Sequence, residues 1–193
     1  MSNVLISVRD LSVAYEGTTA LDEVSLDIFE DDFLGVIGPN GGGKTSLVRA
    51  ILGNIPYRGT VNYAAELFRG KERLIGYLPQ QNVFDRAFPI SVTETVLSGL
   101  QGHKRFRSRY TAEDRRRALE LLERTGIAEV AGRAIGEISG GQMQRALLCR
   151  AIISEPRLLI LDEPTSSLNE SDSKALLDLL LRFKQEGMTC III

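Results

Sequence analysis

The sequence has 193 residues, of which 44% are hydrophobic and 25% are charged, and its 23 basic and 25 acidic side chains give a net charge of −2. These values are typical of a globular chain and exclude disordered or disulfide-stapled classes, while the missing basic excess disfavours a general nucleic-acid binder. The N-terminus lacks a signal-peptide pattern and no apolar run reaches the roughly 20 residues of a membrane span, so we expect any membrane role to go through a partner.

The first part of the chain predicts strands and one helix. Alternating apolar residues from 5 to 28 indicate β-strands, with a turn at Gly17. The apolar run 33–37 predicts a strand buried on both faces, as in a parallel sheet. Further along we expect a helix over 43–52 and short strands over 59–63 and 74–78.

The second part predicts mostly helices, each opened by a capping residue. Ser91, Thr111 and Ser139 each precede a helical pattern by one position and have an acidic or amide side chain three residues later. A second doubly buried strand is expected over 158–161, an amphipathic helix over 170–185 and a last strand over 189–193.

The strongest motif in the sequence is a phosphate-binding loop between the strand at 33–37 and the following helix. Its eight residues match G-x-x-x-x-G-K-[ST]: Gly38, Pro39, Asn40, Gly41, Gly42, Gly43, Lys44 and Thr45. Glycines let successive backbone N–H groups point at a polyphosphate, and the helix N-terminus adds a partial positive charge. Lys44 is expected to reach the β- and γ-phosphates of ATP, and the Thr45 hydroxyl to ligate Mg²⁺.

Two carboxylates follow the buried strand at 158–161. Because strand ends gather at one edge of a parallel sheet, Asp162 and Glu163 should lie near the phosphate loop. Asp162 could hold Mg²⁺ through water, and Glu163 could polarise the attacking water as a general base.

Several separate motifs in order resemble the nucleotide-binding domain of ABC transporter ATPases, over essentially the whole chain. Ser139, Gly140, Gly141 and Gln142 look like the signature motif, and Asp162 and Glu163 like the Walker B pair. The resemblance implies that Tyr15 stacks on adenine, that Ser46 extends the phosphate loop, and that Gln80 senses Mg²⁺ and the catalytic water. Asn169 stands where the family has an aspartate in its D-loop.

The resemblance also implies the architecture, an α/β fold with a RecA-like P-loop NTPase core, an antiparallel β subdomain and an inserted α-helical subdomain. We expect one domain over 1–193, with the ATP-binding core and β lobe in 1–88 and 154–193 and the helical lobe in 89–153. In this family the signature helix of one subunit contacts the γ-phosphate held by the other. The expected partner is therefore a second copy in a head-to-tail homodimer.

The segment after Gln80 resembles the branch that energises manganese, zinc and iron uptake. Phe84, Phe88 and Pro89 are expected to dock a transmembrane permease at the cytoplasmic face of the membrane. In the alternative interpretation, Phe88 and Ile90 only anchor the helical lobe. The basic stretch 103–110 is followed directly by acidic residues, which favours a solvated or headgroup-facing loop over a nucleic-acid site.

Three functions fit these residues: the ATPase subunit of a metal-ion transporter, a soluble ABC-type ATPase without a transport role, or a non-hydrolysing ATP-dependent dimerisation module. The sequence ends inside an apolar strand, so we expect a C-terminally truncated domain. The family's switch histidine would follow that strand, and the only histidine here is His103, in the helical lobe. We therefore expect this chain to bind ATP but to hydrolyse it more slowly than a longer form.

Overall fold

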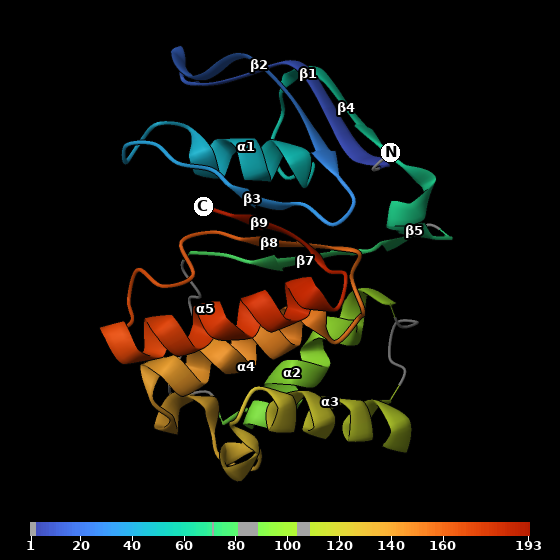
Figure 1. The fold of residues 1–193 in the computed structure, drawn as a ribbon, viewed down its shortest axis with the longest axis vertical. Coiled ribbons are helices and arrows are strands. Elements are labelled where there is room, and N and C mark those ends of the chain that lie inside the picture. Colours follow the sequence, from blue (N-terminus) through green and yellow to red (C-terminus); the bar gives the residue numbers. More distant parts are fainter. Residues whose placement is uncertain (1–2, 71, 81–88, 104–108) are drawn as a thin grey trace.

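The computed structural model describes residues 3–70, 72–80, 89–103 and 109–193, leaving out the side chain of His103 (Figure 1). Its strands are β1 (Val4–Tyr15), β2 (Thr18–Phe29), β3 (Phe33–Gly35), β4 (Arg58–Tyr63), β5 (Phe68–Arg69), β6 (Glu72–Arg73), β7 (Ile75–Leu78), β8 (Leu158–Leu161) and β9 (Thr189–Ile192). Its α-helices are α1 (Lys44–Ile51), α2 (Val92–Leu97), α3 (Ala112–Arg124), α4 (Gly140–Ile152) and α5 (Glu170–Gln185). Short 3-10 turns cover Ala65–Leu67, Ser98–His103, Ala128–Val130 and Ile135–Glu137.

These elements form layers, with helix α1 between two sheets (Figure 1). The antiparallel sheet has the order β2-β1-β4, and the parallel sheet has the order β3-β9-β8-β7. Apolar side chains of β1, α1 and β8 share one buried cluster, among them Val8, Val48 and Ile160. The predicted β subdomain is therefore confirmed, and its packing on α1 holds the start of that helix against the parallel sheet.

The parallel sheet confirms one strand prediction and corrects another. All four residues of β8 are buried, as the apolar pattern of 158–161 indicates. The strand predicted over 33–37 is shorter, and it is not buried on both faces, because β3 pairs only with β9 and lies at the sheet edge. Ile37, which follows it, is 97% exposed. An apolar run identifies a strand but does not distinguish an edge position from a central one.

Helices α4 and α5 cover the other face of the parallel sheet, and α2 and α3 lie beyond them (Figure 1). Helix α4 contributes side chains to two buried clusters. Leu147 and Leu148 pack with the sheet and α5, whereas Ala146 and Cys149 pack with α2 and α3. Helix α4, which Ser139 caps, thus packs against both the core and the helical lobe.

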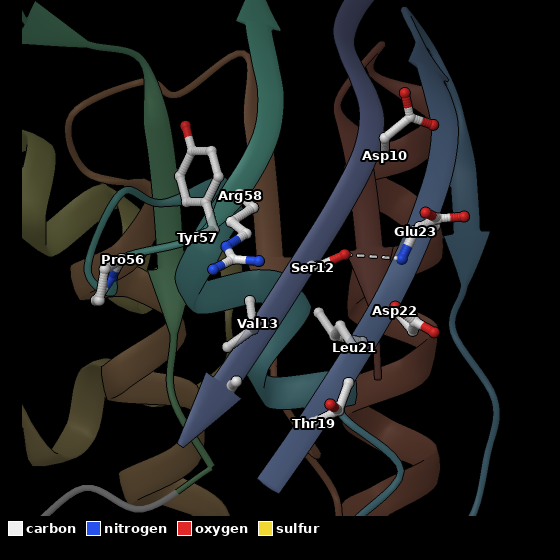
Figure 2. Close-up of a pocket in the computed structure, with 11 residues that line it drawn as sticks. Asp10, Ser12, Val13, Thr19, Leu21, Asp22, Glu23, Pro56, Tyr57 and Arg58 are labelled. Atoms are coloured by element: carbon white, nitrogen blue, oxygen red, sulfur yellow. Dashed lines mark hydrogen bonds between the residues drawn. The ribbon is translucent and has the colours of Figure 1, made fainter. Parts of the chain in front are cut away.

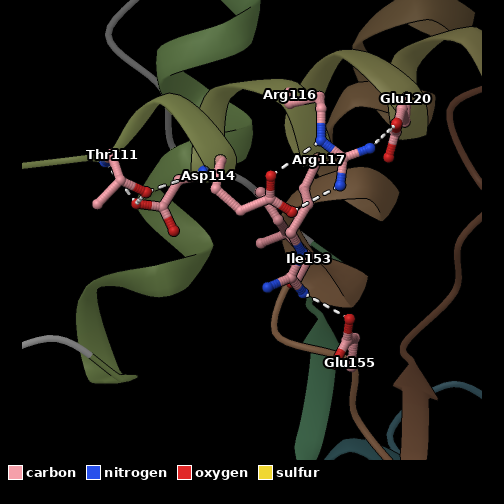
Figure 3. Close-up of polar contacts among 8 residues, drawn as sticks. Thr111, Asp114, Arg116, Arg117, Glu120, Ile153 and Glu155 are labelled. Atoms are coloured by element: carbon pink, nitrogen blue, oxygen red, sulfur yellow. Dashed lines mark hydrogen bonds and ion pairs between the residues drawn. The ribbon is translucent and has the colours of Figure 1, made fainter.

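The predicted helix caps are confirmed in detail. Ser91, Thr111 and Ser139 each accept a hydrogen bond from the backbone N–H three residues later. In return, the side chain of that later residue accepts a hydrogen bond from the backbone N–H of the cap. Figure 3 shows the Thr111 cap together with Arg117, which donates to the Ile153 carbonyl at 2.8 Å and pairs with Glu155 at 2.8 Å. The latter contacts join helix α3 to the segment that leads into β8.

In the described part of the chain, no helix is long and apolar enough to cross a membrane.

Candidate functional site

The phosphate loop lies between β3 and α1, where the motif predicts it. Gly41 and Gly43 have φ values of 77° and 82°, a region that favours glycine. A Cβ atom on Gly43 would lie 2.3 Å from the Ala20 carbonyl oxygen. The loop can therefore close against β2 only because this position carries no side chain.

The start of α1 is prepared for an anion. Its N-cap, Gly43, offers no side-chain hydrogen bond, and the first turn contains no acidic residue. Lys44 Nζ donates to the carbonyl oxygens of Gly38 and Pro39, both at 2.9 Å. The ammonium group thus lies inside the loop, beside helical N–H groups that no cap occupies, and both attract phosphate oxygens.

Asp162 follows β8 directly and lies beneath the start of α1. Its backbone N–H donates to the Leu78 carbonyl at 2.9 Å, and its Oδ1 accepts from the Thr45 hydroxyl at 3.2 Å. Oδ2 is buried and has no hydrogen-bond partner among the described residues. Since a buried carboxylate oxygen without a partner is costly, this position fits a hydrated cation.

Glu163 meets Gln80 at the end of the neighbouring strand. Gln80 Nε2 donates to Glu163 Oε2 at 2.5 Å, although 82 residues separate them in the sequence. An amide that donates through Nε2 has its Oε1 as the atom that could ligate a metal. The φ of Glu163 is 47°, a strained value for a residue with a side chain.

These residues enclose one pocket of about 460 Å³. Tyr15, 43% exposed, lies at its rim, with its hydroxyl 3.3 Å from Ser46 Oγ. The lining residues are Tyr15, Ala20, Asn40, Gly41, Gly43, Lys44, Thr45, Ser46, Gln80 and Glu163. The pocket thus combines an aromatic ring, a cation, loop amides and a carboxylate, the set that an aromatic base and a polyphosphate need.

The predicted signature residues do not line this pocket. Ser139 N-caps α4: its backbone N–H donates to Gln142 Oε1 at 3.0 Å, and its Oγ accepts from the Gln142 N–H at 3.2 Å. Ser139 and Gly140 are exposed, and Gly141 is buried. Within one chain, the start of α4 therefore lies apart from the pocket. A site that is completed by a second copy requires such a separation.

A larger hollow of about 610 Å³ lies on the antiparallel sheet (Figure 2). Tyr57 and Arg58 line one side, and Asp10, Asp22 and Glu23 line the other. Three carboxylates against one guanidinium repel a polyphosphate, so this hollow is a poorer candidate for binding a nucleotide than the smaller pocket, despite its size.

Some predicted positions lie outside the described residues. They are Phe84 and Phe88 of the docking segment and residues 104–108 of the basic stretch, together with the side chain of His103. Pro89 and Ile90 are described, and Ile90 packs against the cluster of the helical lobe. In the described part of the chain, no group of three or more His, Cys, Asp or Glu side chains could hold a metal ion.

Two residues near the pocket belong to no sequence motif and could not be predicted from one. Ala20 lines it because β2 brings its carbonyl against Gly43. Tyr77 lies on β7 below α1, and burial, then the nearby charge of Asp162, raise its pKa. Tyr77 precedes Gln80 by three positions, but only strand pairing indicates that it shares a sheet face with Asp162.

The chain is similar in sequence to a known family and to curated proteins. A family model described as "ABC transporter" matches residues 21–166. The manganese transport system ATP-binding protein MntB of Halalkalibacterium halodurans is 35% identical over 191 residues, covering 99% of this chain and 76% of that protein. The high-affinity zinc uptake system ATP-binding protein ZnuC of Bacillus subtilis is 38% identical over 172 residues, covering 88% of this chain and 74% of that protein.

The chain also resembles solved structures of ABC transporters. An inward-facing ABC transporter superposes with a TM-score of 0.86 at 32% identity, covering 98% of this chain and 72% of that chain. A dimeric bacterial ABC transporter cassette superposes with a TM-score of 0.79 at 26% identity, covering 97% of this chain and 87% of that chain.

Proposed function

Since this chain belongs to the ABC transporter family of ATP-binding domains, we propose that it binds and hydrolyses ATP to drive the transport of divalent metal ions. The observation that carries the proposal is the convergence of Lys44, Gln80 and Glu163 on one pocket, with Asp162 bonded to Thr45 beneath it. The relatives named for manganese and zinc transport indicate the class of transported ion.

Each residue of the pocket has a distinct task in this proposal. Tyr15 stacks on the adenine, and the loop from Gly38 to Ser46 holds the phosphates through its amides and Lys44. Glu163 accepts a proton from the attacking water, and Gln80 orients that carboxylate through the bond at 2.5 Å.

Magnesium fits the same pocket. Thr45, Gln80 and Asp162 would hold it, directly or through water, and the buried Oδ2 of Asp162 supports this. The ion would neutralise charge that develops on the phosphates.

The proposed assembly contains two copies of this chain and a permease. Ser139 to Gln142 would complete the nucleotide pocket of a second copy in a head-to-tail dimer, because they are separate from their own chain's pocket. The dimeric cassette that this chain resembles supports the presence of two copies. Docking of the permease near residues 81–90 would hold the subunit at the cytoplasmic face of the membrane.

Substitution of Glu163 tests hydrolysis. We expect Glu163→Gln to keep ATP binding and to lower kcat by about 100-fold or more, because the amide cannot take the proton. The ATP-bound dimer should then accumulate and be seen by light scattering on a sizing column.

Lys44→Ala is the matched control, since it should lose ATP binding and form no ATP-dependent dimer. Hydrolysis by Glu163→Gln at the wild-type rate would show that Glu163 is not the base. No ATP binding by folded wild-type protein would refute the proposal altogether.

A further inference from the structure

The backbone at Glu163 is held in its strained conformation by neighbours on both sides. Its N–H donates to the Ile193 carbonyl at 3.0 Å, and its carbonyl accepts from the backbone N–H and hydroxyl of Ser166 at 3.2 and 3.1 Å. A left-handed φ at a non-glycine residue persists only when such contacts over-determine it. The direction of the Glu163 side chain therefore depends on what holds residues 163–166.

One further contact on this segment comes from helix α4. Gln144 Nε2 donates to the carbonyl oxygen of Pro164 at 2.8 Å, and the bond is partly buried. Gln144 lies five positions after Ser139, in the second turn of α4. The helix that begins with the signature residues is thus bonded to the residue next to Glu163.

The first turn of α4 is also packed closely against the start of α5. A Cβ on Gly141 would lie 2.3 Å from a carboxylate oxygen of Asp172. Arg145 Nε donates to the Gly141 carbonyl at 3.2 Å, and its guanidinium lies 3.7 Å from Asp172. Asp172 is in turn bonded to Asn169, the N-cap of α5. The start of α4 is therefore in contact with the start of α5, whose N-cap Asn169 ends the segment that follows Glu163.

We propose that Gln144 is a positioning residue for Glu163, which links the position of the signature helix to the alignment of the base. The inference rests on the proposed function, because it takes Glu163 as the general base. When Ser139 engages the nucleotide of a second copy, α4 shifts and Gln144 carries the Pro164 carbonyl with it. Gln144 touches neither ATP nor water in this account, and acts only through the backbone of residues 163 and 164.

The test compares Gln144→Met, which keeps the length of the side chain but removes its donor, with Gln144→Lys, which retains a donor. The same substitution at the exposed Gln185 in the last turn of α5 is the control. In Gln144→Met we expect the Ser166 amide to exchange its hydrogen several-fold faster in nucleotide-free protein. We also expect kcat to fall by about tenfold, the effect of one ordinary hydrogen bond, with an unchanged Kd for ATP and a Tm lower by about 2–4 °C.

Gln144→Lys should recover part of both losses, and Gln185→Met should match the wild type. Unchanged exchange at Ser166 in Gln144→Met would overturn the inference, as would identical behaviour of the Met and Lys variants. The exchange measurement needs no hydrolysis. A wild-type chain that fails to hydrolyse ATP would therefore refute the proposed function, while the exchange rates would still decide whether Gln144 holds residues 163–166.

Discussion

At the scale of single residues, the proposed nucleotide pocket depends on positions where neighbouring atoms fix the conformation of the backbone or of a side chain. Gly43 is confined by the Ala20 carbonyl, and Asp162 by its bond to Thr45. Glu163 combines a left-handed backbone with a side chain that Gln80 holds. Such constraints preorganise the pocket, since the groups need little rearrangement when a ligand arrives.

Gly43→Ala should therefore damage both folding and binding. The left-handed backbone alone costs about 1–2 kcal/mol for a residue with a Cβ, and the clash with Ala20 adds to it. We expect a lower free energy of unfolding in urea and weaker ATP binding by calorimetry.

Gly17→Ala is the matched control, because Gly17 has a φ of 85° but open space where a Cβ would lie. It should show only the backbone cost and bind ATP normally. Equal losses in the two variants would mean that the approach of Ala20 to Gly43 is unimportant.

At the scale of elements, the helices begin where local hydrogen bonds allow them to. Thr111 illustrates this, because its hydroxyl accepts from the Asp114 N–H at 3.1 Å and donates to the Asp114 carboxylate at 2.7 Å (Figure 3). The cap sets the first residue of α3, and further along the helix Arg117 reaches Ile153 and Glu155. The cap thus fixes where α3 begins, whereas its apolar residues Ala118 and Leu122 decide which face packs on the core.

Thr111→Ala should lower the free energy of unfolding by about 0.5–2 kcal/mol, since the cap and its return bond are both lost. ATP affinity should not change, because α3 does not line the pocket. Chemical denaturation and calorimetry measure the two effects.

Ser171→Ala, in the first turn of α5 but not at its cap, is the control and should change stability by less than about 0.5 kcal/mol. A Thr111→Ala chain as stable as this control would show that the cap contributes nothing.

At the scale of the whole molecule, two buried cysteines make the free energy of unfolding depend on pH. Cys149 lies in the cluster of the helical lobe and Cys190 in the cluster between the parallel sheet and α5. Burial raises the pKa of Cys149 to about 11 and that of Cys190 to about 12. The folded chain therefore binds these two protons more tightly than the unfolded chain does.

These raised thiol pKa values make the folded chain less stable at alkaline pH. Stability from the neutral thiols is fully present below pH 9 and is lost as the pH rises through 11 and 12. The free energy of unfolding should fall by up to about 1.4 kcal/mol per pH unit for each thiol in that window.

Urea titrations at several alkaline pH values would measure this slope, with Cys149→Ala/Cys190→Ala as the comparison. The double variant is expected to be less stable at neutral pH but to lose stability less steeply above pH 9. Parallel slopes for the two proteins would contradict the prediction.

The sequence by itself determined the features that depend on neighbours along the chain. The phosphate loop, the caps at Ser91, Thr111 and Ser139, and the helix over 170–185 are short-range patterns, so they could be read without a structure. The tertiary structure decided the rest: the edge position of β3, the approach of Ala20 to Gly43, and the bond from Gln144 to Pro164. These contacts join segments that are distant in the sequence. They depend on strand order and helix packing, which residue spacing does not specify.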